Sequence, residues 1–105
     1  MNDKNAQDNI REEIERASEA LKASDILFNH RLISDAVSKL YYYLLYHIRA
    51  LLMTKNLEPR SHEGALRLFS LHFVKSGIFE TKASHILSKM MKFREEADYN
   101  PSYSF

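Results

Sequence analysis

Residues 34–55 read SDAVSKLYYYLLYHIRALLMTK, the most apolar segment of the chain with a helical pattern. Apolar residues recur along it three and four positions apart, which is the spacing of one face of an α-helix. The central stripe comprises Val37, Leu40, Leu44, Ile48 and Leu51, and it is widened by Ala36, Tyr43 and Leu52. We therefore predict a helix over about residues 34–55 and expect it to be the most buried element.

A helix with the same spacing is predicted upstream, over about residues 8–28. Its apolar stripe comprises Ile10, Ile14, Ala17, Leu21, Ser24 and Phe28. Asp8 is suited to cap its N-terminus, and Glu12 and Arg16 are four residues apart, where opposite charges attract on a helix surface. Asn29 and His30 interrupt the pattern, so we expect a short turn between the first two helices.

Two more helices are predicted downstream, over about residues 62–76 and 81–97. Ser61 is the expected N-cap of the third helix, and Gly77 follows it where a positive φ is common. The inner face of the third helix comprises Ala65, Leu66, Phe69 and Phe73, and the stripe of the fourth comprises Ile86, Met90, Phe93 and Ala97. Short connections between consecutive helices favour antiparallel neighbours. No segment alternates between apolar and polar residues with the period of two that marks a β-strand, so we expect no strands. The expected fold is an all-α, up-and-down antiparallel bundle in a single domain over residues 1–105, with residues 1–7 and 101–105 as tails.

Composition excludes several classes of protein. The 105 residues contain no cysteine, so disulfides, cysteine zinc sites and thiol nucleophiles are absent. The net charge of +1 is too small for broad electrostatic capture of nucleic acid, although a local basic cluster is compatible with it. The N-terminus lacks the apolar segment of a signal peptide, and residues 40–48 are too few to span a membrane. We expect a soluble, cytoplasmic protein without membrane association.

The candidates for chemistry are histidines and arginines. No histidine pair has the HExxH spacing, and two glycines cannot form a glycine-rich phosphate loop, so we expect no metal site and no cofactor. Tyr41, Tyr42, Tyr43 and Tyr46 point in different directions around one helix, and both core packing and an interface suit them. Near the C-terminus, Arg94 precedes Asp98 and Tyr99. This segment is either a solvated helix end or an arginine that grips a phosphate with both of its outer nitrogens.

Three stretches together resemble the HEPN superfamily, specifically its small UPF0332 group. SKLYYY and RALL (residues 38–43 and 49–52) resemble the family's Ser-Arg/Lys-x-Tyr-Tyr-Ala helix with its Ala-Leu-Leu continuation. PRSHEG and FVKSG (residues 59–64 and 73–77) resemble its Lys-Thr-His-x-Gly and Phe-Val-Lys-x-Gly segment. REEADY (residues 94–99) resembles its Leu-Arg-x-x-Ala-Asp-Tyr ending. The likeness spans residues 35–100, and its specificity lies in the order and spacing of the three stretches.

The resemblance implies a bundle of four or five helices, a homodimer, and a minimal nucleotidyltransferase as partner in a toxin–antitoxin module. Many HEPN proteins are metal-independent RNases with an Arg-x(4–6)-His motif on the late helix, facing the dimer cleft. There the arginine would stabilise the developing negative charge on the phosphate, and the histidine would take the proton of the attacking 2′-hydroxyl.

The family motif transfers to this chain only in part. Arg94 matches the arginine, but Asp98 stands where other groups have histidine, and aspartate is a weak base at neutral pH. His62 is the best alternative base, whereas Arg67 and His72 have the literal spacing on the wrong helix. Tyr99 resembles the tyrosine that receives AMP in some systems.

Three functions stay open: a dimeric HEPN protein that pairs with a nucleotidyltransferase and presents an RNA- or nucleotide-facing cleft, a metal-independent RNase toxin, and a non-catalytic helical adaptor.

Overall fold

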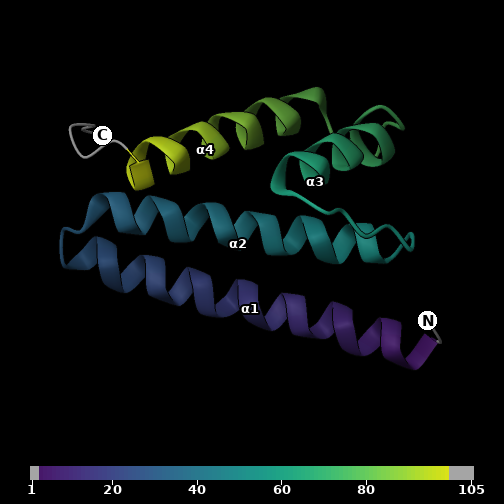
Figure 1. The fold of residues 1–105 in the computed structure, drawn as a ribbon, viewed down its shortest axis with the longest axis horizontal. Coiled ribbons are helices and arrows are strands. Elements are labelled where there is room, and N and C mark those ends of the chain that lie inside the picture. The colour runs from purple at the N-terminus through teal and green to yellow at the C-terminus, as the bar shows by residue number, and fades with distance from the viewer. Residues whose placement is uncertain (1–2, 100–105) are drawn as a thin grey trace.

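The computed structural model describes residues 3–99, which form an all-helical fold (Figure 1). The elements, in chain order, are α1 (Asp3–Asn29), α2 (Ile33–Met53), α3 (His62–Phe69), the π-helical turn η1 (Ser70–Val74) and α4 (Thr81–Tyr99). Helices α1 and α2 form an antiparallel hairpin, and α4 runs antiparallel to α2. No strand occurs among residues 3–99, and the predicted all-α, up-and-down bundle is confirmed.

Helix α2 is the centre of the fold, with α1 on one side and α3 and α4 on the other (Figure 1). Among the described elements, α1 packs against α2 alone. Three large side chains of α2, those of Tyr41, Leu45 and Leu52, are completely buried. They pack with Phe69 of α3 and Leu87 of α4 in one apolar core. The prediction that this helix is the most buried element is therefore confirmed.

The face that α2 turns toward the core is rotated from the predicted stripe. Ile48 of the stripe is buried, but Leu44 and Leu51 are only half-buried, whereas the residues that follow them, Leu45 and Leu52, fill the core. Since successive helical positions point about 100° apart, much of the predicted stripe lies along one flank of α2. The predicted centre of the buried face is therefore wrong, because periodicity locates an apolar stripe but not the neighbour that covers it.

Helix α1 differs from its predicted stripe in the same way. The line that faces α2 consists of Glu13, Ala17, Ala20 and Ser24, all buried. Ala17 and Ser24 belong to the predicted stripe, but Ile14 and Phe28 are 46% and 62% exposed. Small side chains at the contact let the two helices approach closely, and the Ser24 hydroxyl donates a 2.8 Å hydrogen bond to the Ala36 carbonyl oxygen.

The limits of the first two helices differ from the sequence prediction. Helix α1 begins at Asp3, so Asp8 lies inside the helix and is not its N-cap, and residues 3–7 are not a tail. The predicted tail over residues 101–105 lies outside the described residues. Helix α2 ends at Met53, two residues before the predicted end.

The third predicted helix is interrupted. Ser61 caps α3 as predicted, since its Oγ accepts a 2.9 Å hydrogen bond from the Gly64 amide. After Phe69 the chain widens into η1, where the Lys75 amide donates to the Ser70 carbonyl oxygen five residues back. Gly77 has the predicted positive φ, at 89°. Helix α4 continues two residues beyond the predicted end, which places Tyr99 on the helix.

None of the helices over residues 3–99 combines the length and the apolar character needed to cross a bilayer.

Candidate functional site

Arg94 is a buried cation between two tyrosine rings. Its side chain, on α4, is only 10% exposed, and its guanidinium carbon lies 5.3 Å from the ring centre of Tyr41 and 5.9 Å from that of Tyr99. Asp98, one helical turn on, accepts a long contact of 3.4 Å from Nη1, while the buried Nε has no hydrogen-bond partner. Burial opposes the charge, but the Asp98 hydrogen bond and the nearby tyrosines raise the pKa of Arg94 above its ordinary value.

Tyr41 forms the floor of this site. It is fully buried, and its ring lies edge-on to that of Tyr42 at 5.4 Å. Its hydroxyl group is buried without a hydrogen-bond partner, and burial raises the pKa of Tyr41, so the phenol stays neutral. Of the two roles considered for the tyrosines, core packing therefore applies to Tyr41. The side chains of Tyr42, Tyr43 and Tyr46 are half-buried around the helix.

His62 enters the same site from the first residue of α3. Its ring centre lies 5.9 Å from that of Tyr41 and 5.8 Å from that of Tyr42. Burial, followed by the positive charges of Arg94 and Arg49, lowers the pKa of His62. The imidazole is therefore neutral at pH 7, and a neutral imidazole can accept a proton. The structure thus brings Arg94 together with the histidine that the sequence suggested as the alternative base.

Beside His62, a small cavity of about 150 Å³ extends the site. Its polar lining comes from Arg49 of α2 and from Arg60, Ser61 and His62 at the start of α3. Two guanidinium groups and the N-terminus of a helix make this cavity a favourable environment for an anion. The local basic cluster that net charge could not reveal is therefore present here.

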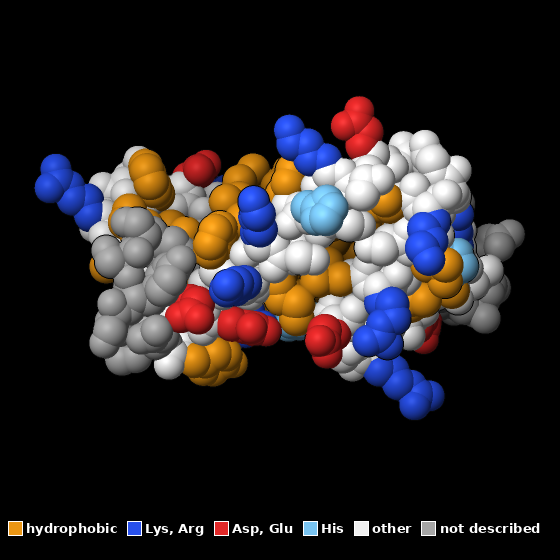
Figure 2. Space-filling model, turned by 90° about the horizontal axis from the view of Figure 1, so that it is seen from above, with side chains coloured by type: hydrophobic (Ala, Val, Ile, Leu, Met, Phe, Trp, Pro, Cys, Tyr) orange, Lys and Arg blue, Asp and Glu red, His pale blue; other side chains and the backbone are white. Residues whose placement is uncertain are grey.

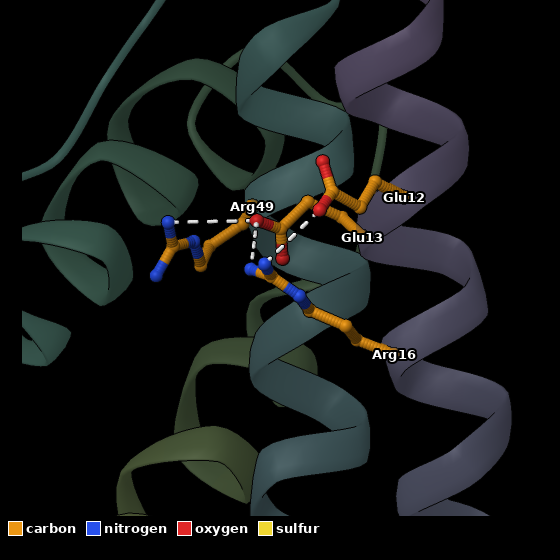
Figure 3. Close-up of polar contacts among 4 residues, drawn as sticks. All are labelled: Glu12, Glu13, Arg16 and Arg49. Carbon is orange, nitrogen blue, oxygen red and sulfur yellow. Dashed lines mark hydrogen bonds and ion pairs between the residues drawn. The ribbon is translucent and has the colours of Figure 1, made fainter.

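Arg49 is held in place by a carboxylate from α1 (Figure 3). Glu13, whose side chain is 4% exposed, points from α1 toward α2, and its Oε1 lies 3.5 Å from Arg49 Nη2. The same oxygen lies 3.4 Å from Arg16 Nη1, and Arg16 also contacts the exposed Glu12 at 3.2 Å. The Glu12–Arg16 pair is confirmed, but the role of Glu13 was not predicted from the sequence. The only sign of this role in the sequence is that Glu13 has helical spacing with Ala17 and Ala20, the small residues of α1 that face α2.

The other candidate motif does not join the site. Arg67 is exposed on α3, and His72 lies in η1, where its carbonyl oxygen accepts hydrogen bonds from Lys55 Nζ and the Ser76 hydroxyl. The outer edge formed by α3 and α4 carries charged side chains of both signs, so it is not a uniformly basic surface (Figure 2). Over residues 3–99 no group of three acidic or histidine side chains could hold a metal ion.

The family model described as the HEPN domain matches residues 10–105. The chain belongs to the HEPN family. Among its relatives are two proteins of Methanocaldococcus jannaschii that are both named "putative toxin". One is 44% identical over 86% of this chain and 70% of its own length, and the other is 34% identical over 83% of this chain and 59% of its own length. A UPF0332 protein of Thermotoga maritima is 32% identical over 86% of this chain and 68% of its own length. No solved structure matches this HEPN chain.

The lowered pKa of His62 predicts how the stability of the protein depends on pH. In the unfolded chain this imidazole takes up a proton near pH 6.5, whereas the folded chain keeps it neutral to lower pH. The unfolded state then binds more protons, so the free energy of unfolding falls as the pH drops below about 6.5. NMR titration should place the His62 pKa below 6.5, and Arg94→Gln should move it upward because a nearby positive charge is removed. An unshifted His62 resonance in both proteins would contradict the geometry of the site.

Proposed function

We propose that this HEPN protein is the toxin-side component of a two-component module and that its Arg94 site binds the phosphate of RNA or of a nucleotide. The observation that carries the proposal is the buried Arg94 guanidinium, whose Nη1 has a long contact to Asp98 and whose Nε has no partner. A guanidinium with free donors binds two phosphate oxygens at once, and flanking aromatic rings hold its plane in position. The HEPN family and the names of the two archaeal relatives support the toxin side of the module.

The surroundings of Arg94 favour a polyanion over an isolated phosphate. Arg49, Arg60 and His62 line the neighbouring cavity, so a second phosphate could bind beside the first. Tyr42 and Tyr46, with ring centres 6.2 Å apart, are half-buried on the same helix and offer faces on which bases stack. These features support a short single strand of RNA or a nucleotide as the ligand.

Metal-independent RNA cleavage is the second candidate, and the neutral His62 beside Arg94 favours it. His62 would take the proton of a 2′-hydroxyl group, whose oxygen attacks the adjacent phosphorus. The bond to the 5′-oxygen breaks as that oxygen takes a proton from water, which leaves a 2′,3′-cyclic phosphate and a 5′-hydroxyl group, and the His62 imidazolium then returns its proton to the solvent. Arg94 would stabilise the charge on the phosphate oxygens during this step. In this scheme Asp98 orients Arg94 rather than acting as the base, because the two side chains are hydrogen-bonded.

The partners proposed are a second copy of this chain and a minimal nucleotidyltransferase. Tyr99 supports the second partner, since it is 75% exposed next to Arg94. An exposed hydroxyl beside a phosphate-binding arginine could receive AMP from such an enzyme. Co-expression with the product of the neighbouring gene tests this part: co-purification and a mass increase on Tyr99, absent from Tyr99→Phe, are expected. A neighbour that neither binds nor modifies the chain would remove the partner from the proposal.

The binding test compares Arg94→Gln with Arg67→Gln, an exposed arginine outside the site. Titration with AMP and with a short single-stranded RNA should show affinity reduced about tenfold or more for Arg94→Gln, the loss of roughly one charge-assisted hydrogen bond. Arg67→Gln should bind like the wild type. Equal affinities for all three proteins would refute the phosphate site.

The same RNA, incubated in EDTA, distinguishes binding from cleavage. Products that form with the wild type but with neither Arg94→Gln nor His62→Gln would establish the RNase. Intact RNA alongside normal binding would restrict the site to recognition.

A further inference from the structure

A groove of about 520 Å³ lies between α1 and α2. Its α2 wall consists of Lys39, Tyr42 and Tyr46, which are three and four residues apart and therefore lie along one side of that helix. Its α1 wall includes Ala20 and Ala23, whose short side chains leave room beside the tyrosine rings. Binding sites for small molecules have volumes of about 300–1,000 Å³, so this hollow, the α1–α2 groove, can hold one nucleotide.

The two tyrosine rings give the groove an aromatic surface. The ring centres of Tyr42 and Tyr46 are 6.2 Å apart, and the ring planes are inclined by only 33°. Both side chains are half-buried, so packing holds the rings in place while part of each ring lines the groove. Bases stack on such rings whatever the sequence, because every base has an aromatic face.

Two cations line the groove beside the rings. Arg16 of α1 is already engaged by two carboxylates of its own helix, at 3.2 and 3.4 Å. Lys39 is exposed and forms no ion pair with any of residues 3–99, so its charge is available to a phosphate. Glu19 adds one carboxylate to the wall. A lysine without a counter-charge next to aromatic rings is the combination with which proteins hold single-stranded nucleic acid.

The α1–α2 groove is continuous with the Arg94 site. Tyr42 belongs to both, because it lines the groove and its ring centre lies 5.8 Å from that of His62. Arg16 of the groove and Arg49 of the cavity beside His62 also meet at one carboxylate oxygen of α1 (Figure 3). A strand that has one phosphate at Arg94 can therefore place its next nucleotide in the groove.

We propose that the α1–α2 groove binds the nucleotide next to the one held at Arg94, with its base on Tyr42 and Tyr46 and its phosphate at Lys39. The inference rests on the proposed phosphate site and specifies its ligand as single-stranded RNA instead of a mononucleotide. The bases of a duplex are paired and stacked on one another, so only an unpaired strand presents a base to the rings.

Titration of the full chain with AMP and with the dinucleotide pApA, methylated on its 2′-oxygens to prevent cleavage, tests the groove. The wild type should bind pApA at least about fivefold more tightly than AMP, because one stacked base strengthens binding by about that factor or more. Tyr46→Ala should remove this advantage, and Tyr46→Phe, which keeps the ring, should retain it.

Tyr43→Ala is the matched control for the loss of a ring. Tyr43 is also a half-buried tyrosine of α2, but its ring packs against His47 at 4.9 Å and does not line the groove. This variant should keep the wild-type preference for pApA. Circular dichroism should show the same helical spectrum for all the tyrosine variants.

Lys39→Gln tests the phosphate contact through the effect of salt. For polyadenylate with the same 2′-O-methyl groups, the slope of log affinity against log salt concentration should become shallower by about 0.7, the contribution of one phosphate contact on a single strand. Lys82→Gln, an exposed lysine at the start of α4, should keep the wild-type slope.

The outcomes separate the groove from the Arg94 site. Binding of pApA that is no tighter than that of AMP, or equal losses of both ligands in Tyr46→Ala, would overturn the second nucleotide site and leave the phosphate site in place. So would an unchanged salt slope in Lys39→Gln together with an unchanged preference in Tyr46→Ala. A wild type that binds neither AMP nor RNA would refute the phosphate site, and the groove with it.

Discussion

Leu52→Ala is expected to lower the free energy of unfolding by about 2–5 kcal/mol. The Leu52 side chain is completely buried and belongs to the apolar core in which α2 meets α3 and α4. Its truncation removes apolar contacts and leaves a cavity that the surrounding helices close only in part. A protein of this size has a total stability of about 5–15 kcal/mol, so the variant should unfold at markedly lower urea concentrations.

Urea unfolding followed by circular dichroism measures this loss, and Leu71→Ala is the control. Leu71 is the same residue type, 50% exposed in η1, so its truncation should change stability by no more than about 0.5 kcal/mol. Losses of similar size at the two sites, or a loss below about 1 kcal/mol for Leu52→Ala, would contradict the assignment of α2 as the central helix.

The helices were predictable because the signals that define them are local. Ser61 caps α3 by bonding an amide three residues away, and Gly77 takes the positive φ that an ordinary side chain disfavours. The break into η1 gave no such signal. The segment keeps its apolar spacing there, and only the backbone hydrogen bond from Lys75 to Ser70 shows that the helix has widened.

The rotation of the buried faces could not be predicted from one chain. Leu44 and Leu45 are equally apolar, and only the positions of α3 and α4 determine which of them is buried. The apolar spacing of α2 therefore predicted a helix correctly, but it did not identify which side of that helix α3 and α4 cover.

The part of the candidate site that lies within a single turn of α4 was predictable from the sequence. Arg94 and Asp98 are four residues apart on α4, and the contact between them follows from helix geometry. His62 was identified as the spare base, but its approach to Tyr41 depends on how α3 packs on α2. The contribution of Arg49 and Glu13 was missed, because charged residues inside a helical pattern are ordinarily taken to lie on the solvated side.

Glu13→Ala is expected to cost about 2–3 kcal/mol, although the residue carries a charge. Its carboxylate is buried between α1 and α2, where it faces Arg16 and Arg49 (Figure 3). Removing it leaves the Arg49 side chain, whose Nε is already buried without a partner, lacking its counter-charge. Breaking a fully buried ion pair costs about 3–5 kcal/mol, and we expect a smaller loss here because both arginines are more than one third exposed to solvent, which screens their interaction with Glu13.

Glu12→Ala separates burial from charge, since Glu12 is the adjacent residue and contacts the same Arg16. Its side chain is 59% exposed, so the loss should be no more than about 1 kcal/mol in the same urea unfolding experiment. Equal losses for the two variants would mean that the Glu13 contact contributes no more than a surface pair. A larger loss for Glu13→Ala, with weaker binding of AMP beside His62, would show that a carboxylate on α1 positions Arg49 for the site, because Arg49 lines the cavity that His62 borders.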